Sequence, residues 1–307
     1  TSHVQLPASP SFLLSTEISS IYSQGGKLRR IHNIVFSPSV ETCEKINNEL
    51  VKRGCNLHSD GRPIIGIPAK DLVKIILEID PRTLIIPAHV WTPWFSVYGS
   101  QSGFDSLEEC FGEMAKFIYG GETGLSSDPA MNWRIKELDH RSILSNSDAH
   151  SGPKLGREAT VFEMEEVSYE NIRKAIVNGC HSERSEESPD KKNRIAYTLE
   201  FYPEEGKYHY TGHRACGIKQ TPEETRRLGE TCSVCGKHLT VGVMHRVDQL
   251  ASLNPKLQMT NDQFGVKWIG CDNRPPYAML VPLQEIIAES MGSAPASIKV
   301  QNEYNKL

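Results

Sequence analysis

The chain has 307 residues, of which 38% are hydrophobic and 23% are charged, a balance typical of a folded protein with a buried core. No run approaches the ~20 consecutive apolar residues of a membrane-spanning helix, and a net charge of -4 provides no general attraction for nucleic acid, so DNA binding would need a local basic surface. Eight cysteines are too few for a disulfide scaffold, and we expect a cytoplasmic protein.

Short apolar runs alternate with amphipathic segments from residue 12 to residue 179, a pattern typical of an α/β architecture with parallel strands. The runs predicted to be buried strands are 12–14, 31–36, 84–86 and 143–144. The segments predicted to be helices are 40–53, 69–79, 107–119 and 169–178. Ser39 and Ser168 are the expected N-caps of the first and last of these helices. We therefore expect a layered or barrel α/β domain.

The alternation stops at a polar, charged stretch, residues 180–194, which has no apolar periodicity and is predicted to be an insertion or linker. It divides the chain into a first domain, 1–179, a small module, 195–250, and a C-terminal helical segment, 251–307. Within the last two parts, residues 195–202 are predicted to be a strand and residues 280–291 a helix that begins near Pro282.

Side chains that bind metals recur next to the predicted strands. Glu17 follows the first apolar run and His89 follows the third. Asp148 and His150 follow the fourth run, whereas His32 lies within the second. Singly, His32 is more simply a hydrogen-bonded core residue and Asp148 a turn residue. Because the carboxyl ends of parallel strands meet at one mouth, the joint pattern predicts a multinuclear metallohydrolase site.

A second group of metal ligands lies in the small module. His213 and Cys216 are separated by two residues, fifteen residues follow, and Cys232 and Cys235 are again separated by two. This spacing predicts a closed, structural zinc site rather than a redox pair. The alternatives for the fourth ligand are His209, His238 and His245, because spacing does not fix the direction of a ring.

Four aromatic residues follow His89 and would lie at the same mouth: Trp91, Trp94, Phe95 and Tyr98. Such rings can stack on bases, and an enzyme acting beside a damaged base can hold that base between them. The alternative is that they only pack the loop against the domain. Scattered basic residues, Arg214 among them, could add a local positive surface.

Five runs of sequence resemble the polymerase and histidinol phosphatase (PHP) superfamily, and within it the endonuclease Q family. They are LSTEIS from Leu14, IHN from Ile31, PAHVWTPWF from Pro87, GETGLSSDP from Gly121 and SNSDAHS from Ser145. The resemblance extends from about residue 12 to about residue 291, interrupted by the polar insertion, and includes the zinc module.

This resemblance implies a PHP-type distorted (β/α) barrel with two or three divalent ions, Zn, Mn or Mg, in addition to the one structural Zn. It implies that Asp148 and Glu17 are catalytic, and that five residues are metal ligands: Glu17, His32, His89, Asp148 and His150. It further implies a DNA repair endonuclease that cuts on the 5' side of deaminated bases such as uracil and hypoxanthine. The family opens with a His-x-His pair that this sequence lacks. We therefore expect the metal site to be incomplete if Thr1 is the true start.

Two other functions are compatible with these residues: a phosphoesterase acting on a small phosphorylated metabolite, and a catalytically impaired DNA-binding fragment. The zinc module and the aromatic residues favour a polymeric substrate. No phosphate-binding loop of the G-x4-G-K-[ST] type is present, so a nucleotide triphosphate is not an expected partner. The sequence predicts no oligomeric state.

Overall fold

The structure is a computed structural model that describes residues 10–58, 61–179 and 192–306. Its strands are β1 Ser15–Gln24, β2 Lys27–Phe36, β3 Ile64–Ile65, β4 Leu84–Pro87, β5 Gly120–Glu122, β6 Ser142–Leu144, β7 Ala159–Glu163, β8 Arg194–Glu200, β9 Thr211–His213, β10 Ile218–Gln220, β11 Gln258–Asn261, β12 Lys267–Gly270 and β13 Tyr277–Met279. Its α-helices are α1 Val40–Lys52, α2 Ala69–Ile79, α3 Leu107–Phe111, α4 Pro129–Asn132, α5 Tyr169–Gly179, α6 Pro222–Leu228, α7 Val243–Leu250, α8 Leu283–Ser290 and α9 Ile298–Tyr304. Short 3-10 helices are Gly112–Phe117, Lys136–Leu138, Gly152–Lys154, Pro203–Glu205 and Arg214–Cys216.

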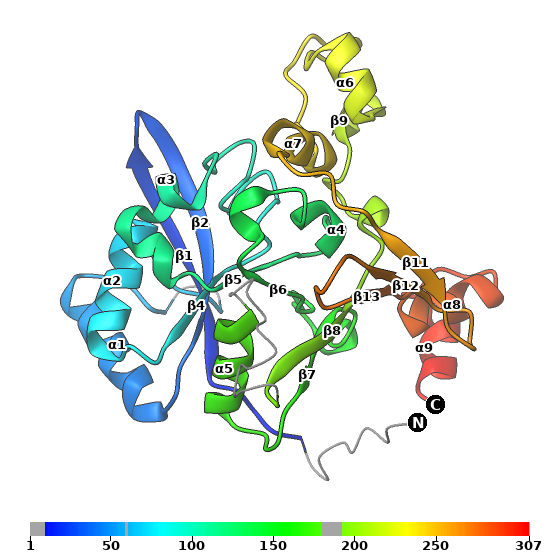
Figure 1. Ribbon diagram of the computed structural model, residues 1–307. Coiled ribbons are helices and arrows are strands. Elements are labelled where there is room, and N and C mark those ends of the chain that lie inside the picture. The colour runs from blue at the N-terminus through cyan, green and yellow to red at the C-terminus, as the bar shows by residue number, and fades with distance from the viewer. Residues whose placement is uncertain (1–9, 59–60, 180–191, 307) are drawn as a thin grey trace.

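A long hairpin of β1 and β2 organises the first half of the chain. The two strands pair antiparallel over their full length and turn at Gly25 and Gly26, both with positive φ, as a tight hairpin turn requires. The full strand order of this sheet is β3-β1-β2-β4. Figure 1 shows α1, α2 and α3 on one side of the hairpin. Their apolar side chains join those of the hairpin in one core, which includes Ile18, Ile31 and Ile76.

The first predicted strand and the predicted strand direction are both wrong. Residues 12–14 are not a buried strand, since Phe12 is 96% exposed and β1 begins only at Ser15. Polar residues interrupt β1, so this strand contains no continuous apolar run. The β1–β2 and β2–β4 pairs are antiparallel, and among the described strands only β1–β3, β5–β6 and β8–β13 are parallel. The described strands form four sheets, and closure into the expected barrel stays a prediction.

Most of the predicted helices are confirmed. α1, α2 and α5 occupy the expected ranges, and Ser39 accepts a hydrogen bond from the Thr42 amide at 3.1 Å as the N-cap of α1. The helix predicted at 107–119 is wrong in its second half. Gly112 has a φ of 53°, which ends α3, and the chain continues as a 3-10 helix.

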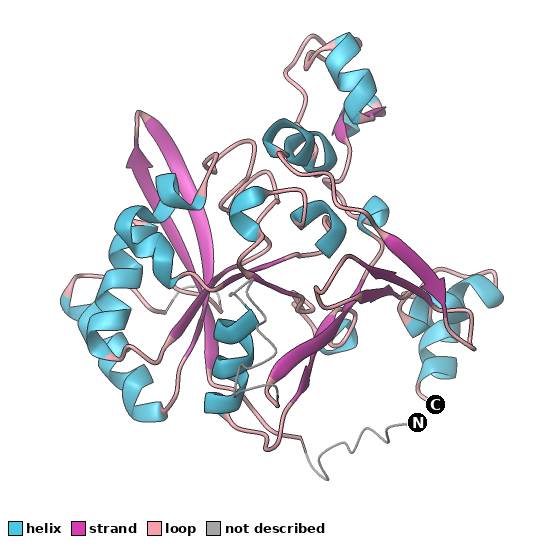
Figure 2. Ribbon diagram, in the orientation of Figure 1, coloured by secondary structure: helices cyan, strands magenta, loops and turns pink. Residues whose placement is uncertain are grey.

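A second, five-stranded sheet combines distant parts of the chain in the order β11-β12-β13-β8-β7 (Figure 2). β8, predicted as a strand, pairs with β7 on one side and with β13 on the other. Residues 251–307 were expected to be helical, which is wrong for β11, β12 and β13, because their pairing partners are far away in sequence. The predicted polar insertion lies mostly outside the described residues, and the division into domains stays a prediction.

The small module is attached to the rest of the fold through α7. Figure 1 shows β9 and α6 projecting from the molecule with α7 at their base. Arg246 of α7 donates to the carbonyls of Tyr98 and Phe104 at 3.0 and 3.1 Å. The Gly242 amide, just before α7, donates to Thr211 Oγ1 of β9 at 3.0 Å. The helix thus connects the module to the loop that follows β4.

None of the helices in the described residues combines the length and apolar character needed to cross a bilayer.

We predict that Gly242→Ala destabilises the attachment of the module. A Cβ atom at this position would overlap the backbone of Tyr210 and Thr211, and such overpacking costs about 1–3 kcal/mol. Gly270→Ala is the matched control, because its Cβ would meet nothing closer than 3.9 Å. Urea unfolding measures both variants. Equal stability of the two variants would show that α7 and β9 do not approach each other as described.

Candidate metal centre

Three strands bring Glu17, His32 and His89 together. In the β1–β2 register Glu17 lies opposite Ile34 and Ser19 opposite His32, so the Glu17 and His32 side chains emerge on the same face. β4 pairs with β2 and ends at Pro87, two residues before His89. The possible ligand atoms of the three residues all lie within 4.8 Å of one another, so the group could hold a metal ion.

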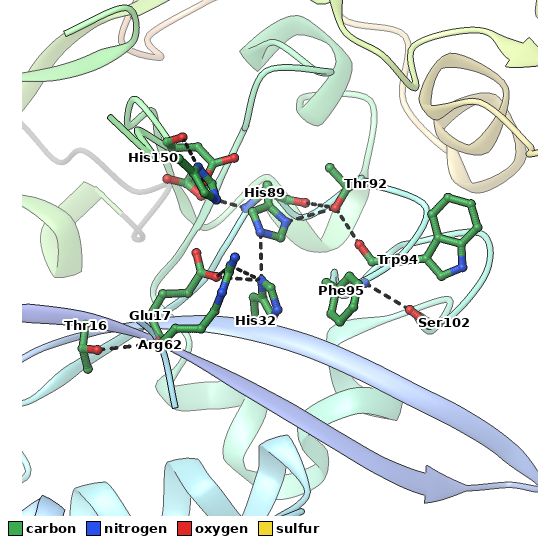
Figure 3. A network of polar contacts seen from close by, with 12 residues as sticks. Thr16, Glu17, His32, Arg62, His89, Thr92, Trp94, Phe95, Ser102 and His150 are labelled. Carbon is green, nitrogen blue, oxygen red and sulfur yellow. Dashed lines mark hydrogen bonds and ion pairs between the residues drawn. The ribbon is translucent and has the colours of Figure 1, made fainter. Parts of the chain in front are cut away.

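The contacts within this cluster are short and mostly buried (Figure 3). His32 Nδ1 is 2.7 Å from Glu17 Oε1 and 3.2 Å from His89 Nε2. Arg62 Nη1 donates to the same Glu17 oxygen. His89 Nδ1 contacts Thr92 Oγ1 at 3.0 Å, which fixes the direction of the ring. One carboxylate and two imidazoles are a suitable donor set for Zn, Mn or Fe.

The Glu17 carboxyl is ionised at neutral pH. Burial raises its pKa, but the hydrogen bond and charge of His32, the charge of His89 and the Arg62 contact together lower the pKa to about 2. Glu17 is therefore available as an anionic ligand, and the Arg62 guanidinium offsets part of its charge.

Asp148 and His150 are not part of this three-residue cluster. Both lie in the loop after β6, where Asp148 has a φ of 44° and its Oδ1 is 3.8 Å from His150 Nδ1. His150 is largely exposed, and its ring is drawn in the same close-up as His89 in Figure 3. The structure thus assembles three of the five predicted ligands directly, and the roles of Asp148 and His150 stay predictions.

Glu122 connects the two parts of the site, and sequence reasoning overlooked it. It ends β5, is 2% exposed, and accepts hydrogen bonds at 2.8 Å from the His89 amide and from Asn146 Nδ2. Burial raises the pKa of its carboxyl, and the charge of Asp148 adds to the shift. Its place at the end of a strand was the available signal. Glu122 holds the His89 and Asp148 loops toward each other.

Two further buried acids, Glu158 and Glu200, lie behind the β5–β6 strands. Glu200 accepts hydrogen bonds from Thr123 Oγ1 at 3.1 Å and Ser145 Oγ at 3.0 Å. Glu158 accepts from the Phe201 amide at 3.1 Å. Burial raises the pKa of both carboxyls, and the charge of Glu200 further raises that of Glu158.

The four aromatic residues divide into two pairs. Trp91 and Tyr98 are at most 1% exposed and stack on each other at 4.7 Å. Their prediction as DNA contacts is therefore wrong, because apolar packing has drawn them into the core. Phe95 is half-buried with its ring 4.8 Å from that of His32. Trp94, also half-buried, meets Tyr208 edge to face at 5.8 Å. These two remain candidates for base contacts.

The second predicted ligand group is also assembled. His213, Cys216, Cys232 and Cys235 place their ligand atoms within 4.8 Å of one another. A tight turn presents the last two, with the Cys232 amide donating to the Lys237 carbonyl and the Gly236 amide to the Cys232 carbonyl.

The alternative histidines are engaged elsewhere or lie outside the group. His209 Nδ1 contacts the Ser126 carbonyl at 3.2 Å, and His238 Nδ1 contacts the Leu239 carbonyl at 2.8 Å. His245 is buried within α7. Cys232 favours the thiolate, since backbone amides and the His213 contact lower the pKa of its thiol despite burial. Three sulfurs and one imidazole suit a structural zinc ion.

Comparisons of sequence find two uncharacterized relatives. No protein-family model matches the chain. It is 33% identical over 223 residues to the protein MJ0043 of Methanocaldococcus jannaschii, covering 70% of this chain and 24% of that protein. It is 31% identical over 257 residues to YqxK of Bacillus subtilis, covering 83% of this chain and 57% of that protein. The chain thus spans from about a quarter to just over half of these relatives.

Comparisons of structure find endonuclease Q. The crystal structure of the lesion-specific endonuclease PfuEndoQ from Pyrococcus furiosus matches with a TM-score of 0.71 and 32% identity, over 90% of this chain and 62% of that chain. Endonuclease Q in complex with a 27-mer duplex substrate carrying an abasic lesion at the active site matches with a TM-score of 0.73 and 32% identity, over 94% and 65%. These similarities support the predicted relationship to endonuclease Q, while the wider PHP relationship stays a prediction.

We predict that Glu200→Gln weakens the pH dependence of stability. The raised pKa of the Glu158 and Glu200 carboxyls means that the folded state binds protons more tightly than the unfolded state. Their contribution to stability is complete below the ordinary pKa of 4.5 and is lost as pH rises through the raised values. Urea unfolding from about pH 5 to 9 should show a smaller loss for Glu200→Gln than for the parent. The control is Glu163→Gln, at an exposed position of β7, which should show the same loss of stability as the parent. Parallel curves for Glu200→Gln and the parent would contradict the raised pKa of Glu200.

We predict that Cys232→Ser removes one zinc ion per chain and lowers the thermal midpoint, because a closed zinc site contributes folding free energy directly. Zinc is measured by mass spectrometry and the midpoint by calorimetry. Cys43→Ser is the control, because Cys43 lies on α1 outside the ligand group. Full zinc content in Cys232→Ser would reject this assignment.

Proposed function

We propose that this protein is a metal-dependent DNA endonuclease of the endonuclease Q type, which hydrolyses the phosphodiester on the 5' side of a deaminated base, uracil or hypoxanthine. Its role would be DNA repair in the cytoplasm. The observation that carries the proposal is that Glu17, His32 and His89 lie together in a chain whose sequence is 32% identical to that of a lesion-specific endonuclease of similar structure.

Two or three divalent ions would be held by Glu17, His32, His89, Asp148 and His150. When bound, such ions lower the pKa of a water molecule and neutralise charge on the scissile phosphate. The residues of the chain provide the fixed frame for this chemistry. Glu17 supplies an ionised carboxylate, the two imidazoles supply nitrogen ligands, and Glu122 holds the His89 backbone in place.

The surroundings of the cluster suit a nucleic acid. Arg62 brings a guanidinium to the same carboxylate, where its charge and fork of donors are suited to a phosphate oxygen. Phe95 lies against His32, and Trp94 directly precedes Phe95 in the same loop. An extruded base could stack on these half-buried rings. A small phosphorylated metabolite would not need aromatic rings at the site.

We predict that Asp148→Asn abolishes cleavage while DNA binding stays intact, because an amide is a much poorer metal ligand than a carboxylate of the same size. The assay uses labelled duplexes with one uracil or one hypoxanthine, and it maps the cut to the 5' side of the lesion. It is run on this chain and on any longer product of its gene. Asp71→Asn, on the exposed side of α2, is the control.

Cleavage by Asp148→Asn at the parent's rate would contradict the assignment of Asp148. Hydrolysis of a small phosphomonoester without nicking of either duplex would instead support the metabolite phosphoesterase.

A further inference from the structure

A cleft of about 460 Å³ lies on the small module, away from the Glu17–His32–His89 cluster. Its lining comes from residues 204–208 and 210–215, from Ile218 and Lys219, and from Thr240. Three exposed cations contribute to it: Lys207, Arg214 and Lys219.

Two of these cations are placed over aromatic rings. Lys219 Nζ is 4.0 Å from the centre of the Tyr210 ring, and Lys207 Nζ is 5.1 Å from the centre of the Tyr208 ring. Both tyrosines line the cleft and are half-buried. A ring face favours a nearby ammonium group without neutralising its charge. The two lysines are therefore held at the cleft while their charge stays available for an anion.

The backbone of the cleft is fixed to the fold. The Val243 amide at the start of α7 donates to the Tyr208 carbonyl at 2.8 Å, and Gly212 and Thr240 exchange two hydrogen bonds of 3.0 Å. Because α7 is also bonded to the loop after β4 through Arg246, the separation between the cleft and the metal cluster is set by the fold.

A continuous series of contacts leads from the metal cluster to the cleft. His89 contacts Thr92 Oγ1 at 3.0 Å, and this hydroxyl lies 2.9 Å from the Trp94 carbonyl (Figure 3). The Trp94 ring then meets Tyr208 at 5.8 Å. Trp94 and Tyr208 thus lie between the cluster and the lysines of the cleft, and aromatic side chains near cations are typical of surfaces that bind a nucleic-acid strand.

We propose that this cleft is a second DNA-binding site, which holds the phosphate backbone of the strand that leaves the metal cluster. Lys207, Arg214 and Lys219 are its phosphate-binding residues. The inference rests on the proposed function, because DNA is the substrate assigned to the cluster. Glu204 and Glu205 also line the cleft, and their carboxylates oppose phosphate binding, so their neutralisation should strengthen it.

The test measures DNA affinity by fluorescence anisotropy, with a labelled duplex that carries one abasic site. All proteins carry Asp148→Asn so that cleavage does not consume the probe. Lys207→Ala with Lys219→Ala should weaken binding about tenfold and reduce the slope of log affinity against log salt by about 2, one unit per lost phosphate contact. Glu204→Gln with Glu205→Gln should tighten binding.

The matched control is Lys256→Ala with Lys267→Ala, which removes the same charge from exposed positions outside the cleft and should leave affinity unchanged. Zinc content and thermal midpoint confirm that each variant is folded. Parent-like binding by the Lys207/Lys219 pair, an equal loss in the control pair, or no tightening in the glutamine pair would each overturn the cleft assignment.

The two proposals fail in different ways. A protein with Asp148 restored that nicks lesion-containing DNA, while the lysine pair has no effect, would contradict the cleft alone. Lysine-dependent DNA binding without nicking, both by this chain and by any longer product of its gene, supports the cleft and contradicts the endonuclease proposal. Absence of DNA binding by the parent would overturn both.

Discussion

The antiparallel pairing of β1, β2 and β4 is the constraint on which the candidate metal centre depends. This pairing places Glu17 and His32 on one face of the hairpin and His89 two residues beyond the end of β4. A slip of one residue in the β1–β2 register would turn Glu17 toward the apolar core. Burying its carboxylate there would be costly. In the observed register Glu17 is also partly buried, but His32, His89 and Arg62 stabilise its carboxylate.

The rest of the fold holds this arrangement in place. His89 has a φ of 30°, a conformation that costs free energy and persists only when its surroundings enforce it. Glu122 holds its amide, Thr92 holds its ring, and Gly124 leaves room for it, since a Cβ there would overlap His89 Cβ. On the other side of the hairpin, α1 and α2 bury the apolar face in one core. Hydrogen bonds and packing thus hold the centre in a backbone conformation that is unfavourable by itself.

The sequence predicted which residues lie together in the two ligand groups better than it predicted the sheets around them. Amphipathic periodicity located α1, α2 and α5, and ligand spacing located the His213 and Cys232 group, because both signals are local. The pairing of β2 with β4 and that of β8 with β13 join segments that lie far apart in the sequence, so strand direction and sheet composition were not predicted. Trp91 and Tyr98 were misassigned because residue type alone does not distinguish a ring that packs from a ring that binds. Glu122 was overlooked although it stands at a strand end within a quoted run.

In the small module, too, residue type alone does not distinguish a binding side chain from other side chains of its kind. Its lysines were not distinguishable from other exposed cations in the sequence, since exposed basic residues are usually only solvated. The structure distinguishes Lys207 and Lys219 by placing them over tyrosine rings beside a preformed hollow. Through α7, the position of that hollow relative to the cluster is fixed by hydrogen bonds rather than by a linker.

The most direct test of the central claim is the number of divalent ions bound per chain, measured by mass spectrometry after equilibration with zinc or manganese. Glu17→Gln removes the negative charge of the Glu17 side chain while leaving the His213–Cys235 group unchanged. Glu78→Gln, an exposed residue of α2, is the control. We expect Glu17→Gln to lose ions from the Glu17–His32–His89 cluster and to retain the structural zinc ion. Glu78→Gln should retain the ions of both groups. An unchanged metal content in Glu17→Gln would show that Glu17, His32 and His89 do not form a metal site.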